Sequence, residues 1–110
     1  MNGNMDGVIR SITAVIVDQC DPDRIVLFGS WAKGTVHRYS DIDLLVIGPF
    51  TESRWLRGRD VREALGRFPV AIDLHCITQS EFDTEAAKSF TYLNTLQSTS
   101  RVLYERQLLT

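Results

Sequence analysis

Short apolar runs bounded by turn residues recur along this chain and restrict the folds that it can form. The first spans Arg24 to Phe28, the second Ile42 to Ile47 and the third Val70 to Ile77. Each run is too short for a stable helix and is rich in branched or aromatic residues, which is typical of buried strands. A further run, Arg101 to Tyr104, predicts a last short strand.

Helical patterns alternate with these runs. From Met5 to Cys20, apolar residues recur at spacings of one, three and four, which is the period of an amphipathic helix. Two more helices are predicted, one from Ser53, a candidate N-cap, to Arg67 and one from Ser80 to Gln97. The alternation predicts an α/β or α+β fold with a small mixed sheet flanked by helices.

Size and charge limit the classes of protein to consider. With 110 residues, of which 44% are hydrophobic, the chain is expected to form a single domain over residues 1–110. Its net charge of -2 argues against a protein that mainly coats nucleic-acid phosphates. Asp6 and Arg10 interrupt the N-terminal segment, which therefore fits neither a secretory signal nor a membrane span. A cytoplasmic location is expected, with Cys20 and Cys76 as free thiols.

Three aspartates stand out within the predicted strands. Asp41 and Asp43 share one strand face, because side chains alternate along a strand. Leu45 and Ile47 follow on that face, so the two carboxylates lie at the edge of the core. Like charges in this position repel, and a divalent cation such as Mg²⁺ between them would relieve the repulsion. Asp73, in the third run, joins them if the two strands are neighbours.

The same residues have simpler interpretations. Asp41 and Asp43 would face solvent on a half-exposed strand, and Asp73 would balance a nearby arginine. His75, on the strand face of Asp73, orders that carboxylate, contacts an acceptor or is a plain partly buried histidine. Five arginines of the predicted middle helix are expected to form a solvated face, with partner docking as the alternative: Arg54, Arg57, Arg59, Arg62 and Arg67.

The loop before the aspartate pair carries groups that suit a phosphate. Gly29 directly follows the first strand and lets the backbone turn sharply and approach a ligand closely. Ser30 adds a hydroxyl and backbone amides that suit anionic oxygens, and Lys33 adds a mobile cation. Together with Ser40, which directly precedes the aspartates, these residues form the predicted nucleotide-binding set. The loop therefore favours the metal site over the solvated strand.

The loop and the aspartates together resemble a known signature. The segment LFGSWAKGTVHRYSDIDLLVIG, from Leu27 to Gly48, is similar to that of nucleotidyltransferases of the polymerase-β-like superfamily, and in particular to the minimal MNT domains. Trp31 and Lys33 stand where many members have arginine. The resemblance implies that the Gly-Ser pair contacts the triphosphate of ATP. It also implies that three aspartates hold two Mg²⁺ ions and act in catalysis: Asp41, Asp43 and Asp73.

The resemblance further implies a reaction and a partner. Two metal ions activate an attacking hydroxyl and stabilise the departing pyrophosphate, with Asp73 as general base or bridging ligand. Minimal members are commonly encoded beside a HEPN-family toxin ribonuclease and act as its antitoxin. We therefore expect transfer of AMP from ATP to a tyrosine hydroxyl of that toxin, without direct nucleic-acid or membrane binding, in a homo- or hetero-oligomer. Two alternatives remain: an antitoxin that acts by binding alone, and nucleotide transfer to a small molecule.

Overall fold

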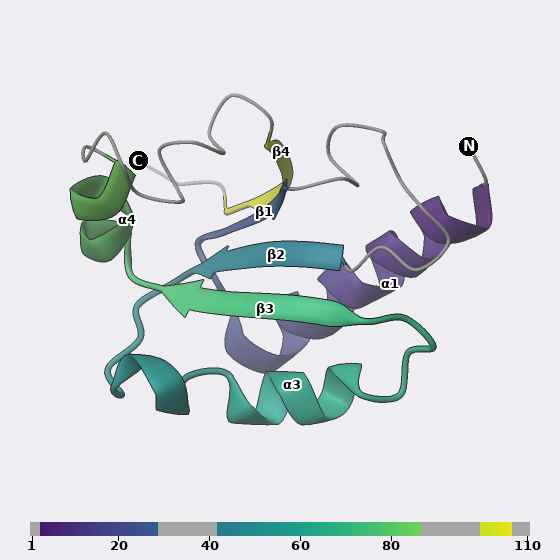
Figure 1. Ribbon diagram of the computed structural model, residues 1–110, viewed down its shortest axis with the longest axis horizontal. Coiled ribbons are helices and arrows are strands. Elements are labelled where there is room, and N and C mark those ends of the chain that lie inside the picture. Colours follow the sequence, from purple (N-terminus) through teal and green to yellow (C-terminus); the bar gives the residue numbers. More distant parts are fainter. Residues whose placement is uncertain (1–2, 29–41, 87–99, 107–110) are drawn as a thin grey trace.

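The computed structural model describes residues 3–28, 42–86 and 100–106, which form a mixed sheet with helices packed against it (Figure 1). Within those residues, the strands lie in the order β3-β2-β1-β4. Their bounds are Arg24–Phe28 for β1, Ile42–Ile47 for β2, Ile72–Ile77 for β3 and Arg101–Glu105 for β4. β1 is antiparallel to β2 and β4, whereas β2 and β3 are parallel. The predicted α+β class with a small mixed sheet is confirmed.

The observed bounds agree closely with the apolar runs. β1 and β2 have the predicted bounds, β3 begins at Ile72 instead of Val70, and β4 ends at Glu105 instead of Tyr104. Helix α4 (Gln79–Ala86) begins beside the predicted start of the last helix. The remainder of that predicted helix lies outside the described residues. Local sequence patterns therefore define these elements well.

Helix α1 (Gly3–Cys20) confirms the predicted N-terminal helix and lies behind the sheet in Figure 1. Its core-facing stripe is buried and consists of Ile9, Ile12 and Ile16. The helix ends where Asp21 adopts a left-handed conformation with φ of 46°, and its N–H donates to the carbonyl of Val17 at 3.0 Å. No helix in the described part of the chain is long and apolar enough to cross a membrane.

The predicted helix from Ser53 to Arg67 is wrong in one respect, because it is broken in two. A 3-10 turn, η1 (Arg54–Leu56), is followed by the helix α3 (Arg59–Leu65). Gly58 separates them with φ of 74°, a left-handed conformation that favours glycine. A Cβ at this position would also lie 2.7 Å from the sulfur of the cysteine on β3. Ser53 precedes η1, but its side chain makes no capping hydrogen bond.

The two faces of the sheet belong to two hydrophobic clusters, because side chains alternate along each strand. On one face, α1 and α3 pack against Ile25, Leu27, Ile42, Leu44, Val46, Leu74 and Cys76. The opposite face carries a smaller cluster, which the partly buried Phe82 of α4 joins: Val26, Phe28, Leu45, Ile47 and Ile77. β2 is therefore buried on both sides beyond its first residues, as predicted.

The expectation of a solvated arginine face is wrong for Arg57. Only 7% of its surface is exposed. Its guanidinium donates to the Glu81 carboxylate of α4 at 2.6 Å, to the main-chain oxygen of Glu52 at 2.9 Å and to that of Cys76 at 3.3 Å. It also lies 5.7 Å from the centre of the Phe50 ring. Arg57 is buried because this one side chain satisfies groups of the segment before η1, of β3 and of α4 at the same time.

Two other arginines of the set also make contacts. Arg62 of α3 donates to the carbonyl of Leu74 on β3 at 3.0 Å. Arg54 forms an ion pair with Glu85 of α4 at the surface. These bonds tie η1 and α3 to α4 and β3, so part of the basic segment is structural.

Both cysteines are free, as predicted. Burial, followed by the neighbouring Cys76 and Asp21, raises the pKa of Cys20 to about 11. Burial also raises the pKa of the Cys76 thiol. Both groups therefore stay protonated at neutral pH and are unsuited to act as nucleophiles.

We expect the hydrogen bonds of Arg57 to contribute substantially to stability. Arg57→Met keeps an apolar stem but removes every bond of the guanidinium, so the free energy of unfolding should fall by about 2 to 3 kcal/mol. The matched variant Arg54→Met loses a surface ion pair and should lose less than about 1 kcal/mol. Urea denaturation at neutral pH measures both values, and equal losses would contradict the role given to Arg57.

The ion pair of Arg57 also predicts a pH dependence. Hydrogen bonds from Arg57 and from the Thr78 amide lower the pKa of Glu81 from 4.5 to about 2. Because the folded pKa is depressed, this carboxylate stabilises the fold above pH 4.5, and the contribution is lost as the pH falls toward about 2. The difference in unfolding free energy between the wild type and Glu81→Gln should therefore shrink over that interval. Urea titrations at stepped pH test this, and an unchanged difference would contradict it.

Candidate functional site

Two of the three predicted aspartates lie side by side. Asp43 on β2 and Asp73 on β3 are register partners in the parallel ladder. The condition for their convergence, that the two strands be neighbours, is therefore met. Side chains at paired positions of parallel strands project from the same face, and neighbouring strands lie about 4.8 Å apart. The sheet thus presents two carboxylates next to each other.

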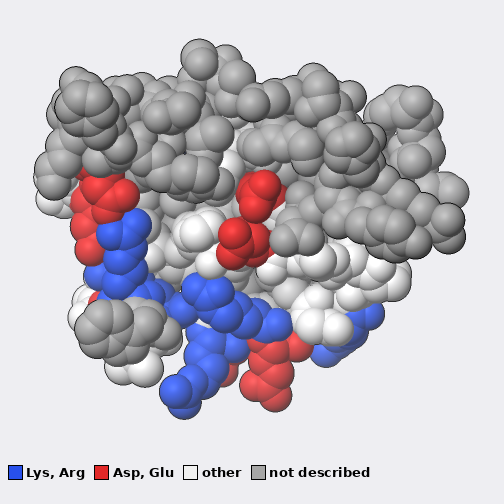
Figure 2. Space-filling model, in the orientation of Figure 1, with Lys and Arg blue, Asp and Glu red and all other residues white. Residues whose placement is uncertain are grey.

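The carboxylate pair lies on the face opposite α1, at the edge of the second hydrophobic cluster. Asp43 is half-buried, while 55% of the Asp73 side chain is exposed. Leu45 and Ile47 continue the same face of β2 and are buried. Figure 2 shows acidic side chains in the middle of this face and arginine side chains below them. The pair is therefore partly desolvated and still accessible from outside.

His75 makes the contact expected of one of its predicted interpretations, in which it orders Asp73. Its Nε2 lies 3.2 Å from Oδ2 of Asp73, a hydrogen bond along the same strand face. The imidazole also lies beside the ring of Phe28, with centroids 6.0 Å apart and planes at 41°. His75 thus orders the Asp73 carboxylate and is itself held by a buried ring. Phe28 was missed from the sequence because its contact with His75 crosses the sheet.

The other predicted site residues lie outside the described part of the chain: Gly29, Ser30, Lys33, Ser40 and Asp41. The described residues on either side of that segment are informative. Phe28, which precedes it, pairs with Asp43, and Ile42, which follows it, pairs with Ile72. The chain therefore leaves the sheet and returns to it at the end that carries the two carboxylates.

The donor set of this end of the sheet suits a hard divalent cation. Carboxylate oxygens are the ligands that Mg²⁺ prefers, and a carboxylate held by a hydrogen bond is pre-oriented for coordination. Among the described residues alone, no group of three acidic, histidine or cysteine side chains is placed to hold a metal ion. Asp43 and Asp73 would therefore supply two ligands to such a cation, and a complete set would require a contribution from outside the described residues.

Comparisons with known proteins agree with this fold. Residues 11–101 match the family model of the nucleotidyltransferase domain. No curated protein gives a significant match. A crystal structure of a toxin–antitoxin with AMP-PNP is 27% identical, with a TM-score of 0.57 over 87% of this chain and 72% of that one.

Two further solved structures share the fold. A candidate nucleotidyltransferase from Sulfolobus solfataricus is 17% identical, with a TM-score of 0.64 over 91% of this chain and 79% of that chain. A mutant of the toxin–antitoxin MntA-HpeT is 22% identical, with a TM-score of 0.60 over 97% of this chain and 75% of that chain. The family match includes both Asp43 and Asp73 and the segment that resembles the nucleotidyltransferase signature. This chain therefore belongs to the nucleotidyltransferase domain family.

Proposed function

We propose that this chain is an antitoxin that transfers AMP from ATP to a tyrosine hydroxyl of a HEPN-family toxin and thereby neutralises it. The observation that carries the proposal is the in-register pair of Asp43 and Asp73 on an accessible sheet face of a nucleotidyltransferase domain. The likeness to a toxin–antitoxin with AMP-PNP supports both the type of partner and an adenine nucleotide as substrate.

The proposal gives each predicted site residue a role. Two Mg²⁺ ions, when bound, would activate the attacking hydroxyl and offset the charge of the triphosphate. Their ligands would be Asp41, Asp43 and Asp73. The triphosphate would be bound by the residues of the preceding loop: Gly29, Ser30, Lys33 and Ser40. In this assignment the carboxylates of the strands bind the metal ions, and the preceding loop binds the nucleotide.

The exposed carboxylate of the pair fits the side of the site that receives the acceptor. The tyrosine oxygen would bond to the α-phosphorus, the bond to pyrophosphate would break, and the phenolic proton would pass to Asp73. Because 55% of the Asp73 side chain is exposed, a side chain on the surface of another protein can reach it. His75 would hold Oδ2 of Asp73 during this step, at the 3.2 Å contact described above. The site is therefore open enough to admit a protein acceptor.

Metal and nucleotide binding should be visible as a change in thermal stability. Because ligands that bind only the folded state stabilise it, MgCl₂ with a non-hydrolysable ATP analogue should raise the Tm of the wild type by a few degrees. Asp43→Asn and Asp73→Asn should lose most of that rise. Asp60→Asn, a matched change at an exposed aspartate of α3, should retain it. Equal rises in all four proteins, measured by differential scanning fluorimetry, would rule out Asp43 and Asp73 as ligands.

Transfer itself is tested with the product of the adjacent reading frame. The protein, ATP and MgCl₂ should add the mass of AMP to that partner, read by intact-mass spectrometry and located by peptide mapping on a tyrosine. Asp41→Ala and Asp43→Ala should lower the rate by at least about 100-fold, because each removes charge stabilisation at the reacting phosphate. His75→Gln should lower it by about 10-fold, as expected for a residue that orients a metal ligand.

The control for this assay is Asp60→Ala, which should keep the wild-type rate. Neutralisation of the partner without any mass change would instead support an antitoxin that acts by binding alone. Transfer to a small molecule, with the partner unmodified, would support the other alternative and refute the proposal.

A further inference from the structure

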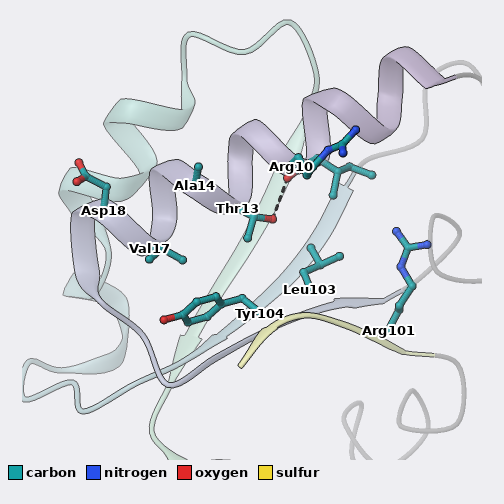
Figure 3. Close-up of a pocket in the computed structure, with 9 residues that line it drawn as sticks. Arg10, Thr13, Ala14, Val17, Asp18, Arg101, Leu103 and Tyr104 are labelled. Carbon is teal, nitrogen blue, oxygen red and sulfur yellow. Dashed lines mark hydrogen bonds between the residues drawn. The ribbon is translucent and has the colours of Figure 1, made fainter. Parts of the chain in front are cut away.

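An open pocket of about 720 Å³ lies between α1 and β4, away from the carboxylate pair (Figure 3). Its apolar wall includes Val17 of α1 and Leu103 and Tyr104 of β4, which are only partly buried. The register of β4 shifts next to Ile25, a β-bulge that brings Leu103 and Tyr104 together on the α1 side. The pocket is thus built by the fold and leaves part of an apolar surface uncovered.

Charges of opposite sign mark the two ends of the α1 side of this pocket. Arg10 and Asp18 are exposed and lie just over two helical turns apart, with Ala14 midway between them. Arg101 of β4 lies at the Arg10 end (Figure 3). Within the described part of the chain, neither Arg10 nor Asp18 forms an ion pair. Arg10, Ala14 and Asp18 thus form a stripe along α1 that has a positive charge at one end, a small residue in the middle and a negative charge at the other end.

Such a stripe is complementary to itself. In an antiparallel pair of α1 helices related by a two-fold axis at Ala14, Arg10 of each copy faces Asp18 of the other. We propose that this face of α1, together with Leu103 and Arg101, is the interface of a homodimer. This proposal goes beyond the proposed enzymatic function and does not depend on it.

Charge pairing, close helix approach and apolar contact favour a second copy of this chain as the partner that covers the pocket. The two Arg10–Asp18 contacts are equivalent by symmetry, and Arg101 adds a second cation toward the incoming Asp18. Ala14 at the axis lets the helices approach closely, and antiparallel helix dipoles attract each other. Val17 and Leu103 supply the apolar contact beside the charges.

The proposed interface leaves the catalytic face free. α1 packs on the sheet face of Leu44 and Val46, whereas Asp43 projects with Leu45 from the opposite face. Both carboxylate pairs of a dimer would therefore remain accessible to nucleotide and acceptor. The dimer would present two independent sites that point away from the shared helices.

Analytical ultracentrifugation of the full chain over a wide concentration range tests the interface. The wild type should dimerise, and Ala14→Glu, which sets two like charges against each other at the axis, should raise the dimer Kd at least tenfold. Gln19→Glu introduces the same residue at an exposed position of α1 outside this pocket and should keep the wild-type Kd. Circular dichroism should show unchanged helix content in both variants.

A charge swap makes the test specific. Arg10→Asp alone should yield monomers, because it faces Asp18 with a like charge, and Arg10→Asp combined with Asp18→Arg should restore dimers. A monomeric wild type, or a dimer that Ala14→Glu leaves intact, would overturn the proposal. The proposal would also be overturned if these variants weakened binding to the toxin and left the dimer Kd unchanged. The pocket would then receive the toxin instead of a second copy of this chain.

Discussion

Parallel pairing of β2 with β3 sets Asp43 directly beside Asp73. Both strands begin at the same end of the sheet, so both carboxylates reach the edge of the core together. Register is critical here, because a slip by one residue would turn Asp73 toward the face that α1 and α3 cover. Burial of Leu74 on that face and of Ile77 on the other opposes such a slip. The core residues of β3 therefore position Asp73, its candidate site residue.

Parallel strands require a crossover connection, and here η1 and α3 provide it between β2 and β3. Gly58 lets the chain turn where a side chain would collide with Cys76, and Arg57 bonds to the main chain of β3 and to Glu81 of α4. The crossover is therefore fastened to the strand that carries Asp73 and His75. Stability and the geometry of the site depend on the same connection.

The two sheet faces serve different tasks. On the face of α1 and α3, continuous apolar packing supplies most of the core. The opposite face buries fewer side chains and carries Asp43, Asp73 and His75 at its edge. Two carboxylates at adjacent positions of a sheet repel each other, and a cation between them would relieve that repulsion.

The sequence by itself determined the helices and strands and the residue types of the site, because hydrophobic periodicity and the signature from Leu27 to Gly48 are local patterns. It also indicated Asp73, but only under the condition that β3 lies next to β2. Tertiary structure decided that condition, the break at Gly58, the burial of Arg57 and the contact of His75 with Phe28. Each of these joins residues distant in the sequence, and no local pattern records which distant groups will meet when the core closes.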